Sequence, residues 1–270
     1  MDTVVSEPTK KKTTTLSPAV WVWLALLAGL GAAFLVDSSV VALLKPLRDS
    51  ELAHVLRHSI RWLGIGYIQG SVLMLLTIAG LWRSGQSLWA ALAMLALCGL
   101  VPLLISVRAA PLGAAEIGAS LAVLIVLAVA VARGLTAPSL WARAGSWTMV
   151  CLVLSGGIAN ILKVLVHRPR PFVTLSPPDS WVGYLRVHEF QSFPSGESTT
   201  AFAVAASLSI WFPRLQVLLM IAATAVAAAR VIVGNHFPSD VWAGAMLGVA
   251  VAQGVTHLAR HRRQGPGSEV

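Results

Sequence analysis

The chain has 270 residues, of which 56% are hydrophobic and only 11% are charged, and its formal net charge is +9. A soluble domain carries roughly 25% charged residues, so this composition excludes an ordinary soluble protein and indicates several membrane-spanning helices. The basic residues are dispersed between apolar runs, which favours cytoplasmic loops and contact with anionic lipid over nucleic-acid binding.

The predicted elements begin after a polar N-terminal segment. Residues 1–16 are expected to form a disordered cytoplasmic tail, since no signal-peptide cleavage site follows the first apolar run. Residues 47–63 have apolar side chains at helical spacing and a polar side, which predicts an interfacial helix. Eight apolar runs are each long enough, or nearly so, to cross a bilayer as a helix; they lie near 18–36, 66–82, 87–107, 113–132, 145–166, 198–213, 216–233 and 239–258.

These runs predict an all-α, polytopic membrane helix bundle of about eight spans. We expect N-terminal transmembrane helices over 17–144, a core over 145–258 and a basic cytoplasmic tail over 259–270. With the N-terminus in the cytoplasm, eight spans place a set of basic residues inside, consistent with the positive-inside rule: Arg83, Arg133, Arg143, Arg214 and the basic run at 260–263. Exceptions on the outer side, besides the clusters described next, are Lys45, Arg48, Arg57, Arg61 and Arg108. The expected location is a bacterial inner membrane with both termini cytoplasmic. Cys98 and Cys151 lie inside apolar runs and are interpreted as core residues.

Three polar clusters interrupt the apolar pattern, and eight spans place all three on the outer, periplasmic side. They are KVLVHRPRP at 163–171, FPSGES at 193–198 and RVIVGNHFPSD at 230–240. Lys163 and Arg170 would share one helix face if the helix persisted, although Pro169 and Pro171 predict that it ends nearby.

The residue types in these clusters suit a tetrahedral oxyanion. Lys163, Arg170 and Arg230 are cations, and guanidinium forks match phosphate oxygens in pairs. The glycine of the Ser195–Gly196 pair lets backbone N–H groups approach an anion at a helix N-terminus.

The third cluster adds a reactive side chain. His236 can act as a nucleophile, and Asp240 can accept its other ring proton. No Cys/His spacing and no pair of carboxylates typical of a metal site is found, so we expect metal-independent phosphoryl transfer through a phosphohistidine, without a cofactor.

The three clusters together resemble the type 2 phosphatidic acid phosphatase superfamily over about 145–258. The resemblance implies a six-helix core with its site at the outer membrane–water boundary, to which the runs before residue 145 add a further hairpin. It implies His236 as nucleophile, Asp240 as its orienting residue, and a set of phosphate-binding residues: Lys163, Arg170, Ser195, Gly196 and Arg230.

Two positions depart from the family pattern. Ala229 stands where the family usually has serine, which removes one hydroxyl contact. Glu197 stands where the second motif normally ends in the histidine that protonates the leaving oxygen. Either Glu197 becomes protonated when substrate binds, or the leaving group needs no acid. The second possibility favours an isoprenyl diphosphate or a lipid A-type phosphate over phosphatidic acid.

Two other functions fit the same motifs. The phosphohistidine of His236 could transfer its phosphate to a lipid acceptor instead of water, or the chain could bind or transport a lipid phosphate without hydrolysing it. An intact His236 and Asp240 favour an enzyme. The helices before residue 145 either pack the bundle or form a lateral wall for lipid tails, and the sequence leaves the oligomeric state open.

Overall fold

The computed structural model describes residues 17–48, 50–56, 66–85, 133, 135, 137–173 and 188–261. Every regular element in these ranges is helical, which confirms the predicted all-α class. The elements are α1 (Pro18–Leu44), η1 (Lys45–Leu47), α2 (Glu51–Val55), α4 (Gly66–Arg83), α7 (Leu140–Val166), η3 (His188–Phe190), α9 (Gly196–Trp211), η4 (Pro213–Leu215), α10 (Gln216–Ile232) and α11 (Pro238–His261).

Four helical segments among the described residues are long and apolar enough to cross a membrane: Ala19–Leu47, Leu140–Val166, Pro213–Ile232 and Pro238–Leu258. Many of their large apolar side chains are exposed, as expected for helices that face lipid. The chain is therefore an integral membrane protein. The predicted spans 87–107 and 113–132, and both predicted tails apart from the last residues of α11, lie outside the described residues.

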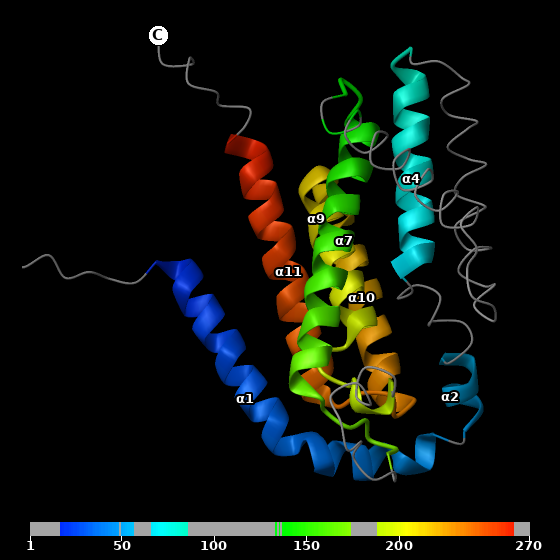
Figure 1. Ribbon diagram of the computed structural model, residues 1–270, viewed down its shortest axis with the longest axis vertical. Coiled ribbons are helices and arrows are strands. Elements are labelled where there is room, and N and C mark those ends of the chain that lie inside the picture. Colours follow the sequence, from blue (N-terminus) through cyan, green and yellow to red (C-terminus); the bar gives the residue numbers. More distant parts are fainter. Residues whose placement is uncertain are drawn as a thin grey trace, which may run out of the picture.

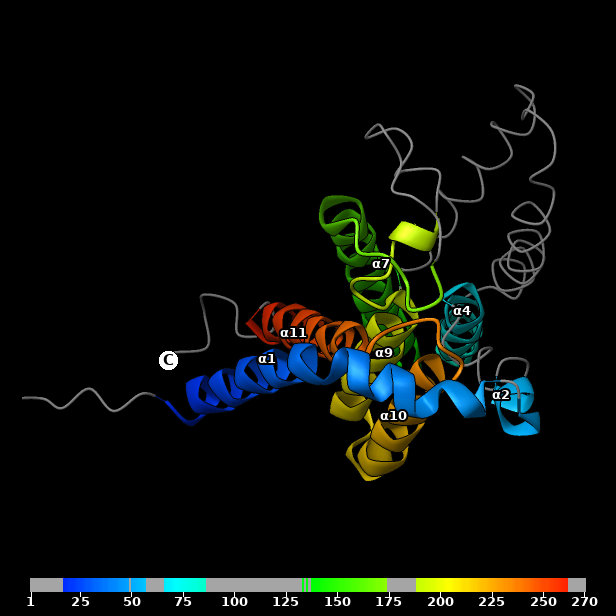
Figure 2. The same ribbon diagram turned by 90° about the horizontal axis from the view of Figure 1, so that it is seen from below.

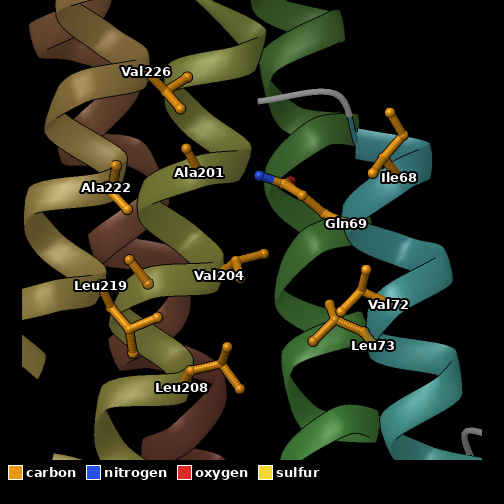
Figure 3. A pocket seen from close by; sticks show the side chains of 12 residues that line it. Ile68, Gln69, Val72, Leu73, Ala201, Val204, Leu208, Leu219, Ala222 and Val226 are labelled. Carbon is orange, nitrogen blue, oxygen red and sulfur yellow. The ribbon is translucent and has the colours of Figure 1, made fainter. Parts of the chain in front are cut away.

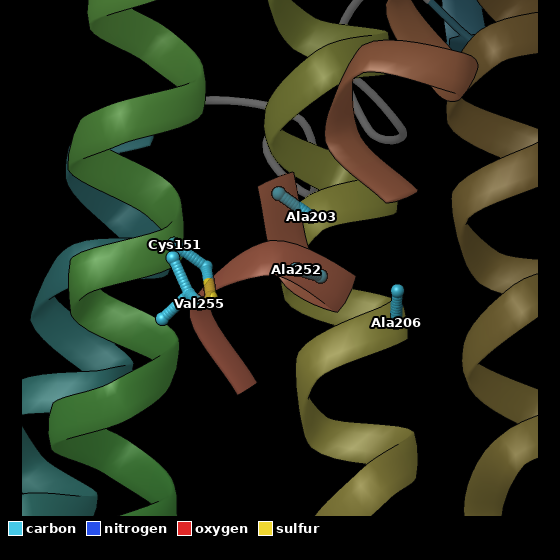
Figure 4. Close-up of a cluster of buried hydrophobic side chains, with 5 residues drawn as sticks. All are labelled: Cys151, Ala203, Ala206, Ala252 and Val255. Atoms are coloured by element: carbon cyan, nitrogen blue, oxygen red, sulfur yellow. The ribbon is translucent and has the colours of Figure 1, made fainter. Parts of the chain in front are cut away.

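Helix α9 forms the centre of the bundle and packs against α7, α10 and α11, while α4 packs on the outer side of α7 (Figure 1). Small residues permit this close packing. A Cβ atom on Gly244 of α11 would lie 2.7 Å from the carbonyl oxygen of Ser195, and one on Gly248 would collide with the Thr199 carbonyl of α9. Figure 4 shows Cys151 in a buried cluster with small residues of α9 and α11, which confirms its predicted core position; Cys98 is outside the described residues.

Helix α1 is longer than the run predicted at 18–36. It continues to Leu44 and lies against α11. Figure 1 shows α1 turning beneath the lower end of the bundle, and Figure 2 shows it crossing that end toward α2. Asp37 is the only buried residue among the described side chains of this otherwise apolar helix. A carboxylate buried in this way requires partners. Arg168 and Ser239 provide them at this end of the bundle.

The connector after α1 touches the bundle at the same end. Within the predicted interfacial helix 47–63, the structure describes α2 and the residues beside it, whereas 57–65 are not described. Leu56 is buried against Ala229 and Val233 at the end of α10. The residue that departs from the family pattern, Ala229, thus belongs to an apolar contact.

Candidate active site

The three predicted polar clusters meet at the end of the bundle beneath which α1 passes (Figure 2). Helix α7 ends at Val166, because His167 adopts a left-handed conformation with φ of 51°. The helix therefore does not persist to Arg170, as the prolines predicted, and a loop brings this residue to the site. A hydrogen bond from the Ser195 N–H to the Asp240 carbonyl, 3.0 Å, joins the starts of α9 and α11.

His236 is buried and is held through its Nδ1 atom. Nδ1 lies 2.9 Å from the carbonyl oxygen of Ser192. A carbonyl oxygen can only accept a hydrogen bond, so Nδ1 carries the proton and Nε2 keeps its lone pair. The carboxylate of Asp240 is 3.6 Å from Nδ1, which is too long for a hydrogen bond and becomes an ion pair only when the imidazole is protonated. The direct acceptor is thus Ser192, where the sequence predicted Asp240.

Asp240 is fully buried and its carboxylate is held on both oxygens. Oδ2 accepts hydrogen bonds from the Ser192 hydroxyl at 2.6 Å and from the Phe237 N–H at 2.8 Å. Oδ1 accepts one from Nη1 of Arg168 at 2.5 Å. These contacts fix the negative charge of Asp240 beside the imidazole, where it can stabilise an imidazolium.

Burial lowers the pKa of His236, and the positive charges of Arg170 and Lys163 lower it further, while Asp240 opposes the shift. A histidine whose pKa lies below its ordinary value is neutral at neutral pH. His236 therefore presents an unprotonated Nε2, the form that can attack phosphorus.

Arg230 is almost completely buried and only partly paired. Its Nη1 lies 2.8 Å from Oε2 of Glu197, whereas Nε and Nη2 have no hydrogen-bond partner among the described residues. Buried donors without partners cost about 1–3 kcal/mol each. An anion with several oxygens would satisfy the two free donors, and Glu197 occupies the third position.

Lys163, in the last turn of α7, places its ammonium group against the first residue of α9. A Cβ on Gly196 would lie 3.1 Å from the Lys163 Nζ, so a side chain at residue 196 would press on that group. The N–H of Gly196 has no acceptor within its helix and, with the helix dipole, favours an anion. Ser195 caps α9, where its Oγ accepts from the Ser198 N–H at 3.4 Å.

Arg170 is positioned by the segment that precedes α9. Its N–H donates to the Glu189 carbonyl at 2.8 Å, and its Nε donates to the His188 carbonyl at 3.1 Å. Burial lowers the pKa of Arg170, and the nearby carboxylates, Glu197 first among them, raise it. An arginine stays cationic after such a shift, because its ordinary pKa is above 12.

Three residues of this site were missed in the sequence. Arg168 lies inside the KVLVHRPRP motif, but its spacing from the other motif residues does not indicate a role. The acceptor at Ser192 is a main-chain carbonyl, so its side chain gives no signal in the sequence. Asp37 had a visible signal, since it is the only charged residue between Pro18 and Leu44, and a lone charge in an apolar run marks function by default.

Comparison with known proteins agrees with the motifs. The sequence profile of the PAP2 superfamily matches residues 144–264. A lipid A 1-phosphatase of Rhizobium etli is 37% identical over 111 residues, which cover 38% of this chain and 45% of that protein. One from Rhizobium johnstonii is 39% identical over 106 residues, which cover 38% and 43%. The matched part is thus less than half the length of either relative.

A transmembrane PAP2-type phosphatidylglycerolphosphate phosphatase from Bacillus subtilis has been solved. It aligns with a TM-score of 0.34 and 18% identity over 89% of this chain and 98% of its own. The family match over residues 144–264 includes every residue predicted to act at the site, from Lys163 to Asp240. Over this segment, the chain matches the PAP2 superfamily.

Proposed function

We propose that this protein is a metal-independent membrane phosphatase that removes phosphate from a lipid phosphate through a phosphohistidine on His236. The observation that carries the proposal is the buried guanidinium of Arg230, whose Nε and Nη2 have no hydrogen-bond partner in the part of the chain that the structure describes. Lys163 and Arg170 add two cations close by. Three cations around a neutral imidazole suit a phosphate dianion that is attacked by nitrogen.

The proposed reaction has two steps. His236 Nε2 attacks phosphorus and forms an N–P bond, while the P–O bond to the lipid breaks and the lipid oxygen departs with the electron pair. Asp240 and the Ser192 carbonyl stabilise the imidazolium character of the intermediate. Water then attacks phosphorus and the N–P bond breaks. Inorganic phosphate is released, and His236 returns to its neutral form.

Glu197 is the candidate for the proton transfers. Its Oε2 lies 2.8 Å from Nη1 of Arg230 in the structure. A bound phosphate would draw on the same guanidinium and weaken that pairing, so Glu197 could take up a proton. It would give this proton to the lipid oxygen in the first step and accept one from water in the second.

An apolar cavity beside the site supports a substrate with hydrocarbon chains. The cavity has a volume of about 230 Å³ and lies between α4, α9 and α10 (Figure 3). Its lining residues Ala201 and Val226 are each four positions, one helical turn, from Glu197 and Arg230. We propose that it receives part of a lipid chain, so α4 would form the lateral wall considered in the sequence analysis.

For the substrate itself we propose a lipid A-type phosphate or an isoprenyl diphosphate. Both relatives described above are named lipid A 1-phosphatase. A glycosyl phosphate or a diphosphate also leaves more easily than an alkyl phosphate, which suits a site where Glu197 replaces histidine. In the proposed orientation both termini are cytoplasmic and the site faces the periplasm.

The test is phosphate release by purified protein from lipid A, undecaprenyl diphosphate, phosphatidylglycerol phosphate and phosphatidic acid. We expect the first two to be the better substrates. We also expect His236→Ala to abolish turnover. The wild type should form an acid-labile, phosphate-labelled protein, and His236→Ala should not. Activity that survives His236→Ala would refute the mechanism. Product analysis with an acceptor lipid separates hydrolysis from phosphate transfer.

A further inference from the structure

Arg168 lies behind the proposed nucleophile and joins two buried carboxylates. Its Nη1 donates to Asp240 at 2.5 Å and to the Ser239 hydroxyl at 2.6 Å. Its Nη2 pairs with Asp37 of α1 at 2.6 Å. The guanidinium also stacks between two rings, 4.2 Å from the centroid of Phe237 and 5.0 Å from that of Phe34. Both terminal nitrogens of this cation are therefore used by the protein itself, and two aromatic rings lie against it.

Asp37 completes the arrangement from a distant helix. Its Oδ1 accepts the Ser239 N–H at 2.9 Å, and its Oδ2 accepts the Ser239 hydroxyl. Hydrogen bonds thus connect Asp37, Arg168 and Asp240, and the Ser192 hydroxyl continues the connection toward His236. A connected buried network of this kind restricts each member to one orientation.

We propose that Arg168 is a positioning residue for the proposed phosphoryl transfer and that Asp37 is its counter-ion, so that together they fix Asp240 against His236 and set the charge balance behind the imidazole. This inference rests on the proposed function. Neither residue contacts the Arg230 side where the phosphate is proposed to bind, and both act through Asp240.

Arg168 and Asp37 carry opposite charges, so replacing each one by a neutral residue should shift the pH profile in an opposite direction. Arg168→Gln removes a cation, so the imidazolium form of His236 becomes more favourable and the acidic limb of kcat/KM moves to higher pH. Asp37→Asn removes an anion, so the same limb moves to lower pH. We expect shifts of about half a pH unit or more in each direction. A merely structural role would not produce opposite shifts.

The other charges around His236 stay in place in both variants. They come from α7, the loop after it, α9, α10 and α11: Lys163, Arg170, Glu197, Arg230 and Asp240. A further cation comes from the residue after η1, since the guanidinium of Arg48 lies against Gly234, two residues before His236.

Arg168→Lys keeps the charge but cannot donate to Asp37 and Asp240 as a planar fork. We expect its pH limb to stay near that of the wild type, while kcat falls about 10-fold or more and KM changes little. Arg214→Gln is the matched control, since Arg214 is exposed in η4 beyond the opposite end of α9. It should leave the pH profile and kcat unchanged.

The titration of His236, followed by NMR of histidine-labelled protein in detergent, gives a readout that needs no substrate. If the wild type releases no phosphate, the proposed function fails, and the NMR titrations still test the inference. If the wild type is active but both charge variants titrate as the wild type does, the inference is overturned and the proposed function stands. Should Arg168→Gln fail to fold, Asp37→Asn and Arg168→Lys decide the question alone.

Discussion

The contact between Glu197 and Arg230 leads to a quantitative prediction about phosphate binding. In the structure, Nη1 of the buried Arg230 lies 2.8 Å from the Glu197 carboxylate, whose side chain is 27% exposed. A phosphate that binds Arg230 must compete with this carboxylate and is repelled by it. Glu197→Gln removes the charge while keeping nearly the same shape, so inorganic phosphate and vanadate should bind more tightly.

The size of the effect follows from the geometry. Two unit charges about 4 Å apart interact by about 4 kcal/mol at an effective dielectric constant of 20. The partial exposure of Glu197 and its freedom to rotate reduce this to about 1.5–2 kcal/mol, or roughly 10–30-fold in affinity. We therefore expect the inhibition constant of phosphate to fall by that factor in Glu197→Gln, measured by competition against a water-soluble lipid phosphate.

Glu189→Gln provides the comparison. Glu189 lies in η3 and contacts Arg170 through its backbone carbonyl, so the variant removes a carboxylate at the same end of the bundle but not from Arg230. Its phosphate inhibition should change less than about threefold. Equal inhibition constants for wild type and Glu197→Gln would refute the reasoning. The kcat of Glu197→Gln then shows whether Glu197 is a proton donor or only repels phosphate. Loss of a proton donor lowers kcat more for an alkyl phosphate than for a diphosphate.

Further predictions concern pH, chain length, packing and metals. The lowered pKa of His236 keeps its reactive neutral form in place as pH falls, so kcat/KM should decline only below pH 6.5; a decline above that value would contradict a neutral nucleophile. Ala222→Phe fills the cavity and should raise KM for long-chain but not short-chain substrates. Gly248→Leu should lower the free energy of unfolding by about 3 kcal/mol, measured by denaturation in detergent, whereas Gly254→Leu, where a Cβ meets open space, should change it little. EDTA should leave activity unchanged; its loss, and recovery on adding a divalent ion, would indicate a metal-dependent reaction.

The helices that carry the motifs could be predicted well from the sequence. Apolar length located α7, α9, α10 and α11, and the two prolines after His167 correctly indicated that α7 ends before Arg170. Motif spacing also predicted that Lys163 and Arg230 lie at one end of the bundle, and the structure places both beside the start of α9.

The contacts behind His236 could not be predicted in the same way. Asp37 and Arg168 are separated by 131 residues, and no periodic pattern connects them. The acceptor for His236 is the main-chain carbonyl of Ser192, which any residue would supply. The apolar run predicted at 18–36 stops before Asp37, whereas α1 continues to Leu44, because Arg168 compensates the charge of this residue.

The link from Asp37 to Ser239 has a consequence for how far the catalytic unit extends. Ser239 is the second residue of α11, and its N–H belongs to the first turn, which needs an acceptor from outside the helix. That acceptor comes from a segment more than a hundred residues upstream of the family match. A fragment cut at residue 144 would retain all three motifs and yet leave the Ser239 N–H without its Asp37 acceptor and Arg168 without its second carboxylate. We therefore expect the smallest active fragment of this protein to include α1.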